Sequence, residues 1–106
     1  MEVARFEVFY TKLDPTQGTE IKKTRPCVIL SPPEMCQLNN VIVAPLNSKG
    51  FLAPSRIPLT FQGKSGLIVL DQIRAIDKSH LGKKLGKLHS STAEKVCQTL
   101  QVLFAY

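Results

Sequence analysis

The chain has 106 residues, with 14 Lys and Arg against 8 Asp and Glu, so its formal net charge is +6 at pH 7. We expect a single domain, residues 1–106, because this length suits one core, and a hydrophobic content of 43% excludes disordered and collagen-like classes. The apolar runs are too short to span a bilayer, and no secretory signal is visible at the start. The odd number of cysteines (Cys27, Cys36 and Cys97) favours free thiols and a cytoplasmic location.

Short apolar segments separated by proline and glycine predict a series of strands. We expect strands over 6–10, 26–31, 41–46, 56–61, 67–70 and 73–76. The run 41–46 is apolar throughout, which is typical of a strand buried on both faces. The segment 73–76 is predicted to be the last strand. The lysines after it either are simply solvated or attract phosphate.

The C-terminal segment changes to a helical period. Its apolar residues recur at spacings of three and four: Ala93, Val96, Cys97, Leu100, Leu103 and Phe104. Ser91 and Glu94 have the spacing of a capping box at the helix start. Strands followed by one packed helix predict a mainly β (α+β) fold, a small and strongly bent antiparallel sheet or barrel closed by a C-terminal α-helix.

The sequence contains no recognisable metal or nucleotide motif. It lacks C-x-x-C, H-E-x-x-H, calcium-loop, Walker and G-x-G-x-x-G patterns, so we predict no metal and no cofactor. Cys27 and Cys97 lie in apolar faces and are predicted to be core residues rather than nucleophiles. The net positive charge favours a polyanion such as nucleic acid, or else reflects only a solvated basic surface.

One polar cluster stands between the first two predicted strands. Glu20, Lys22, Lys23 and Arg25 come directly before a buried strand. Pro26 restricts the backbone of Arg25 to the extended region, and a fixed guanidinium suits a phosphate because its planar fork donates two hydrogen bonds. From the spacing alone, the other interpretation is a solvated loop with a weak surface ion pair.

Four segments together carry a resemblance that covers nearly the whole chain. They are 14–20 (D-P-T-Q-G-T-E), 24–32 (T-R-P-C-V-I-L-S-P), 43–48 (V-A-P-L-N-S) and 71–77 (D-Q-I-R-A-I-D). In this order they resemble the MazF/PemK/Kid family of toxin endoribonucleases. The resemblance implies an SH3-like antiparallel barrel with a C-terminal helix. One departure is Asn47 with Ser48, where the family usually has Thr at the end of the third strand.

The resemblance also implies an activity. It is sequence-specific, metal-independent cleavage of single-stranded RNA such as mRNA, in which a 2′-OH attacks the adjacent phosphate and leaves a 2′,3′-cyclic phosphate and a 5′-OH. Arg25 is then the acid or the charge stabiliser, and we favour charge stabilisation because an arginine rarely releases its proton. Glu20 is the first candidate base and Asp71 the second. Asn47 and Ser48 are expected to position the phosphate by hydrogen bonds.

Further contacts and partners complete these predictions. The residues expected to contact RNA are Thr19, Lys22, Lys23, Thr24, Lys49, Gln72 and Arg74. Gln72 and Arg74 alternate with Ile73, so they share either an RNA-binding face or a solvated one. The resemblance implies a homodimer and an acidic antitoxin that blocks the RNA groove. The alternative is a non-catalytic toxin or binding module on the same fold, either a CcdB-like gyrase poison or a binder of RNA or antitoxin.

Overall fold

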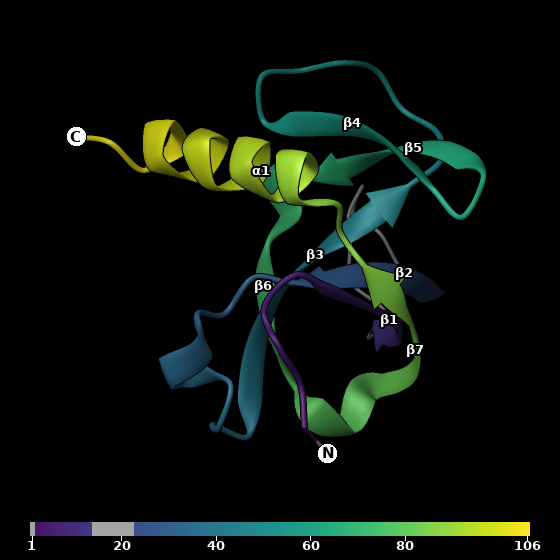
Figure 1. Cartoon of the computed structure of the whole chain (residues 1–106), viewed down its shortest axis with the longest axis vertical. Coiled ribbons are helices and arrows are strands. Elements are labelled where there is room, and N and C mark those ends of the chain that lie inside the picture. Colours follow the sequence, from purple (N-terminus) through teal and green to yellow (C-terminus); the bar gives the residue numbers. More distant parts are fainter. Residues whose placement is uncertain (1, 14–22) are drawn as a thin grey trace.

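The computed structural model describes residues 2–13 and 23–106. Its strands are β1 (Glu7–Leu13), β2 (Lys23–Ile29), β3 (Asn40–Asn47), β4 (Arg56–Phe61), β5 (Lys64–Val69), β6 (Arg74–Asp77) and β7 (Leu81–Lys87). The helix α1 (Ser90–Leu103) follows β7 (Figure 1). Short 3₁₀ turns occur at Pro33–Met35, Leu70–Gln72 and Lys78–His80.

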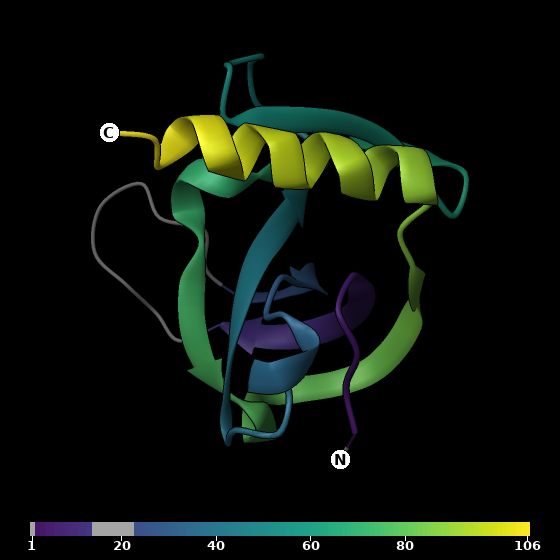
Figure 2. The same ribbon diagram turned by 60° about the vertical axis from the view of Figure 1, so that its left-hand side comes forward.

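The strands form one antiparallel sheet that bends at β3. The order across the sheet is β4-β5-β3-β2-β1-β7, and β6 also pairs with β3. One edge of β3 pairs first with β6, at residues 40–43, and then with β5, at residues 46–47. This change of partner curls the sheet into a half-barrel, and α1 lies across β4 (Figure 2). The predicted mainly β, barrel-like fold with a C-terminal helix is confirmed.

Both faces of the central strands are buried. Val8 and Val28 point into a cluster that includes residues of α1. Their neighbours Phe9 and Ile29 enter a second cluster on the opposite face. Because side chains alternate along a strand, a sheet covered on both sides needs continuous apolar runs. Residues 41–46 of β3 divide between the two clusters in this way, so the prediction of a strand buried on both faces is confirmed.

The prediction that 73–76 is the last strand is wrong, because β7 follows it and pairs with β1. The sequence of β7, L-G-K-K-L-G-K, shows no apolar alternation, and Leu81 is its one buried side chain. Backbone pairing with two register shifts holds the strand instead. Gly82 allows the close approach of the two strands, since a Cβ atom there would lie 3.0 Å from the carbonyl oxygen of Tyr10.

The start of α1 also differs from its prediction. His89 precedes the helix, and its Nδ1 accepts a hydrogen bond from the backbone N–H of Ser91 at 3.3 Å. The Ser91 hydroxyl contacts the same ring nitrogen at 2.9 Å. The predicted capping box of Ser91 with Glu94 is therefore wrong, because an extended His89 already brings its imidazole beside the orphan donors of the first turn.

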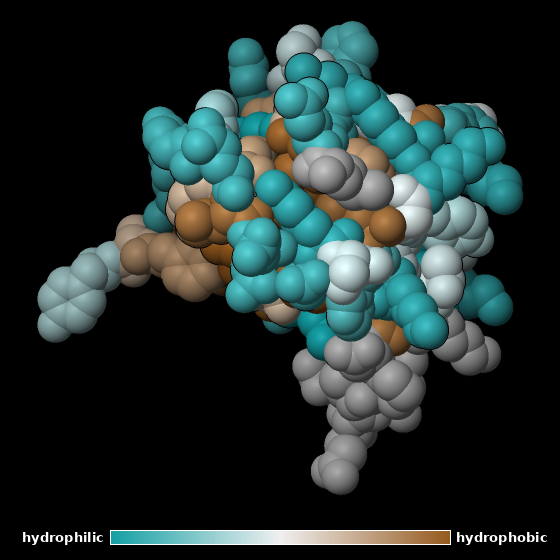
Figure 3. All heavy atoms as spheres, turned by 90° about the horizontal axis from the view of Figure 1, so that it is seen from below, coloured by the Kyte–Doolittle hydropathy of each residue, from teal (hydrophilic) through white to brown (hydrophobic). Residues whose placement is uncertain are grey.

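The apolar face of α1 is covered only over its first half. Ala93 and Val96 are buried in the core, whereas Leu103 is 42% exposed and Phe104 is 67% exposed. Val102, at 77%, adds to this uncovered surface. Figure 3 shows apolar atoms gathered beside the protruding C-terminal end. Within the described residues, no helix combines the length and apolar character needed to cross a membrane.

Candidate active site

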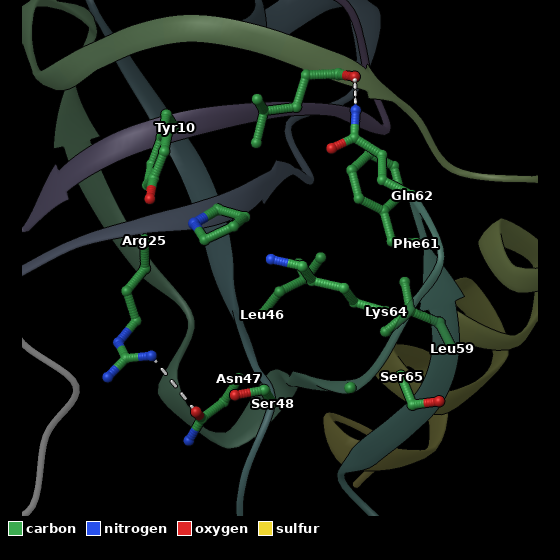
Figure 4. Close-up of a pocket in the computed structure, with 13 residues that line it drawn as sticks. Tyr10, Arg25, Leu46, Asn47, Ser48, Leu59, Phe61, Gln62, Lys64 and Ser65 are labelled. Carbon is green, nitrogen blue, oxygen red and sulfur yellow. Dashed lines mark hydrogen bonds between the residues drawn. The ribbon is translucent and has the colours of Figure 1, made fainter.

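The register between β2 and β3 determines which side chains meet at the ends of these strands. Cys27 pairs with Pro45, so the same register two residues further along places Arg25 opposite Asn47. The two side chains meet there, and Arg25 Nη1 donates a hydrogen bond to Asn47 Oδ1 at 3.4 Å (Figure 4). The backbone N–H of Lys49 donates to the same oxygen at 3.4 Å. These two donors orient the amide of Asn47, with its oxygen toward the guanidinium.

Arg25 and Asn47 belong to the lining of a cavity of about 260 Å³ that is open to solvent. Its apolar walls come from five strands and consist of Tyr10, Pro26, Leu46, Leu59, Phe61 and Leu85. Its polar lining consists of Arg25, Asn47, Ser48, Gln62, Lys64 and Ser65. This volume lies just below the ~300–1,000 Å³ of pockets for drug-sized ligands, so the cavity suits one ring system or one phosphate group.

The charge of the described lining is entirely positive. Arg25 and Lys64 are its ionisable cations, and no Asp or Glu lies among the described residues that line the cavity. The Nε atom of Arg25 is buried and has no hydrogen-bond partner among the residues that the structure describes. Two cations without a carboxylate beside them attract an anion, and a guanidinium can donate two hydrogen bonds to one phosphate. The cavity is therefore suited to hold an anion.

Several residues of this cavity are not among the predicted site residues. These are Tyr10, Phe61, Gln62, Lys64 and Leu85, which converge from β1, β7 and the hairpin between β4 and β5. The predicted strand 67–70 begins too late, because the turn is at Gln62 and Gly63 and β5 starts at Lys64. Nothing in the sequence indicates that this hairpin meets β7. Ser48 was predicted and does line the cavity.

Asp71, the second candidate base, is not part of the cavity lining. Its carboxylate accepts hydrogen bonds from Arg56 Nε and Nη2, both at 3.2 Å, and from the Ser55 hydroxyl at 2.9 Å. The hydrogen bond from Arg56 is the main reason why the pKa of Asp71 lies below its usual value, and the bond from Ser55 adds to the effect. A carboxylate stabilised in its charged form is a weaker proton acceptor.

The other predicted RNA contacts are distributed around the cavity or lie outside the described part of the chain. Thr24 is exposed on β2, one residue from Arg25, and Lys49 is exposed after β3. Gln72 and Arg74 are half-buried and do not line the cavity. The predictions for Thr19, Glu20 and Lys22, and for the side chain of Lys23, lie outside the described residues.

Cysteine chemistry does not contribute to this site. Cys27 is buried, and this burial raises the pKa of its thiol to about 11. A protonated thiol in the core is a poor nucleophile, so the prediction that Cys27 is a core residue is confirmed. Across residues 2–13 and 23–106, His, Cys, Asp and Glu form no cluster of three that could hold a metal ion.

The chain is thus a small antiparallel half-barrel with a C-terminal helix and a basic cavity that has apolar walls. The family model of PemK-like, MazF-like toxins of type II toxin–antitoxin systems matches residues 4–104, so the chain belongs to that family. It is 28% identical over 109 residues to Endoribonuclease PemK of Escherichia coli, covering 96% of this chain and 82% of that protein.

Solved structures agree with this assignment at the level of the fold. MazF from Deinococcus radiodurans superposes with a TM-score of 0.85 at 21% identity, covering 100% of this chain and 99% of that one. An endoribonuclease from a mycobacterial species, in complex with its cognate antitoxin, gives a TM-score of 0.79 at 20% identity, covering 94% and 92%.

Proposed function

We propose that this chain is a metal-independent endoribonuclease that cuts single-stranded RNA at specific sequences. The observation that best supports the proposal is the cavity, which combines two cations with apolar and aromatic walls and has no carboxylate in its described lining. Single-stranded RNA offers anionic phosphates and flat bases that stack on such walls. The membership of the family and the similarity to the E. coli endoribonuclease PemK support the same activity.

The reaction we propose is an internal transesterification. A base removes the proton of a 2′-OH, the 2′ oxygen bonds to the adjacent phosphorus, and the bond from phosphorus to the 5′ oxygen breaks. The leaving oxygen takes up a proton, and the products carry a 2′,3′-cyclic phosphate and a 5′-OH. Negative charge builds up on the phosphate oxygens in the transition state, so fixed donors and cations at that point accelerate the step.

We assign Arg25 the role of stabilising this charge. Its Nη1 contacts Asn47, which orients the guanidinium, and Arg25 lines the cavity, where its planar fork suits two hydrogen bonds to a phosphate. Asn47 and Ser48 line the same cavity and are assigned to hold the phosphate by hydrogen bonds. Glu20 remains the first candidate base, because Asp71 is engaged by Arg56 away from the cavity lining.

We assign the path of the RNA to the surface around the cavity mouth. Thr24 is exposed next to Arg25 in the chain, and Lys49 is exposed two residues after Asn47, which suits contacts to flanking phosphates. Thr19, Lys22, Lys23, Gln72 and Arg74 remain proposed contacts on the basis of the resemblance alone. Phosphate contacts of this kind give affinity, whereas sequence preference comes from contacts to the bases.

We propose that the chain forms a homodimer and binds an acidic antitoxin in the cytoplasm. Val102, Leu103 and the following Phe104 form an uncovered apolar surface at the end of α1. Val102 and Leu103 line a shallow cavity together with Pro54, Ser55 and Thr99. An apolar surface of this kind is typical of an interface between proteins. The net charge of +6 favours an acidic partner. A mycobacterial relative was solved with its cognate antitoxin.

Cleavage of a long single-stranded RNA in the presence of EDTA tests the proposal. We expect discrete cuts with 2′,3′-cyclic phosphate ends, and no cut where the attacking nucleotide carries a 2′-deoxy sugar. Arg25→Ala should lower the rate by about 10²–10³-fold, the typical cost of losing a transition-state donor. Lys95→Met, which removes a charge from the exposed side of α1, is the matched control.

The outcomes separate the proposal from its alternative. Equal cutting by wild type and Arg25→Ala would contradict the role of Arg25 and point to a contaminating nuclease. No cutting by antitoxin-free wild type would contradict the proposed activity and favour a non-catalytic toxin or binding module on this fold.

A further inference from the structure

The hairpin that joins β4 to β5 has a defined conformation. Its central residues, Gln62 and Gly63, have φ angles of 51° and 79°. Two successive positive φ angles are the signature of a type I′ turn, which matches the twist of the flanking strands. A positive φ is normally unfavourable for a residue with a side chain such as Gln62. The sequence nevertheless places a side chain there, which indicates that the side chain has a use.

The hairpin is also attached to the opposite edge of the sheet. Gln62 Nε2 donates a hydrogen bond to the carbonyl oxygen of Leu85 on β7 at 2.6 Å. The Phe61 ring lies against Gly86, where an added Cβ atom would come within 3.2 Å of the ring. β4 and β7 are the two ends of the strand order, so these contacts connect the edges of the half-barrel. They fix the hairpin, and with it the start of β5.

Lys64 begins β5 directly after this turn, and its side chain extends into the cavity (Figure 4). Arg25 approaches the same cavity from β2. The ion pairs between described side chains join Arg56 to Asp71 and Lys84 to Glu7, so neither includes Lys64. The described lining contains no carboxylate that could neutralise its ammonium group. Two cations thus share one cavity without a counter-ion from the described residues.

We infer that Lys64 is a further catalytic residue, a second cation that contacts the scissile phosphate opposite Arg25. The inference rests on the proposed function. When the 2′ oxygen bonds to phosphorus, the phosphate gains negative charge before its bond to the 5′ oxygen breaks. The ammonium of Lys64 contacts a non-bridging oxygen and keeps its proton, while the leaving oxygen takes a proton from solvent water. Charge contacts on both sides of the phosphate favour the transition state over the bound substrate.

The test measures single-turnover cleavage of an oligoribonucleotide that contains a cut site of the wild-type protein. We expect Lys64→Met to slow cleavage by about 10²-fold, the range seen when one preorganised transition-state donor is removed. Binding to the same oligonucleotide with a 2′-deoxy sugar at the cut should weaken only as much as in Lys95→Met, which removes the same charge elsewhere. Lys64→Arg should recover most of the rate.

Three results would overturn the inference, and each identifies a different step of it as wrong. Cleavage by Lys64→Met as fast as by Lys95→Met would remove Lys64 from the reaction while leaving the proposed function intact. Equal losses in cleavage rate and in binding to the 2′-deoxy oligonucleotide would make Lys64 a contact for RNA affinity only. Absence of cleavage by wild type would refute the proposed function itself, and the role of Lys64 with it. Thermal unfolding of each variant shows that a lost rate does not reflect a lost fold.

Discussion

Arg25 and Asn47 face each other at the ends of β2 and β3, and Nη1 of the arginine lies 3.4 Å from Oδ1 of the amide. The distance is long for a hydrogen bond, so the contact orients the guanidinium more than it stabilises the fold. A phosphate that accepts a hydrogen bond from Arg25 would therefore compete only with the weak hydrogen bond from Arg25 to Asn47.

This relationship predicts the effect of Asn47→Ala on cleavage. The variant removes the acceptor that orients Arg25. One hydrogen bond contributes about 0.5–1.5 kcal/mol, so we expect cleavage to be about two- to tenfold slower. Asn47→Thr keeps a hydroxyl near the same place and should lose less. Single-turnover rates measure both effects, and an unchanged rate in Asn47→Ala would show that Arg25 needs no such support.

The choice of general base can be tested with two isosteric variants. Glu20→Gln should slow cleavage by about 10²–10⁴-fold, the usual contribution of a positioned base. Asp71→Asn should cost much less, because Arg56 and Ser55 hold that carboxylate in its charged form outside the cavity lining. A larger loss in Asp71→Asn than in Glu20→Gln would reverse the assignment.

Glu7 is predicted to make the stability of the protein depend on pH. Burial tends to raise the pKa of its carboxyl, but hydrogen bonds from Lys84 and from the backbone N–H of Ala4, the latter at 2.7 Å, outweigh burial and lower it. Because the folded pKa is depressed, this stabilisation is present above the unfolded value of about 4.3 and is lost as the pH falls through the folded value.

Urea denaturation of Glu7→Gln at several pH values measures this contribution. At pH 7 we expect the variant to be less stable by about 1.5–3 kcal/mol, the range for hydrogen bonds to a charged group. The difference should shrink as the pH falls from about 4.3 through the lower folded pKa of Glu7. A difference that stays constant down to pH 2 would exclude the titration of Glu7 as its cause.

Gly86 is predicted to be intolerant of any side chain. Its φ of 156° is a conformation that L residues rarely adopt, and a Cβ atom would come within 3.2 Å of Phe61. Gly86→Ala should therefore lower the free energy of unfolding by about 1–3 kcal/mol and displace the hairpin that carries Lys64. Gly63→Asn is the control, because nothing lies within 4 Å of a Cβ atom at position 63 and Asn suits a type I′ turn.

The uncovered end of α1 gives a prediction about assembly. Val102 is 77% exposed, so Val102→Asp should leave the folded protomer as stable as wild type within about 0.5 kcal/mol. A charge there should nevertheless weaken a dimer that buries this surface. Sedimentation at several concentrations measures the change, and an unaffected dimer would place the interface elsewhere. Lys95→Asp, on the exposed side of the same helix, controls for the added negative charge.

Local sequence patterns predicted the elements whose side chains alternate between core and solvent. β4 has the predicted bounds, 56–61, because Ile57 and the half-buried Leu59 and Phe61 alternate with more exposed neighbours. β7 could not be found in this way, since it is held by backbone pairing with β1. His89 as a cap was missed because histidine is not among the residues usually preferred there.

The site was predictable only for residues that stand in segments with a recognisable local sequence pattern. Arg25 stands beside Pro26 in a recognisable sequence context, and Asn47 and Ser48 end a strand. Lys64 and Tyr10 reach the same cavity from β5 and β1, and only the closure of the half-barrel brings them there. Spacing along the chain carries no information about that closure.

The position of β3 determines which parts of the sheet exchange amide protons through local opening and which only through global unfolding. β3 is covered on both faces and paired along both edges, so the amide protons of Val43 and Ala44 should exchange with deuterium only when the whole domain unfolds. β4 ends the sheet, so its outward amides should exchange through small local openings. Deuterium uptake should therefore begin at the β4 edge, and the centre of the sheet should be the last part to exchange.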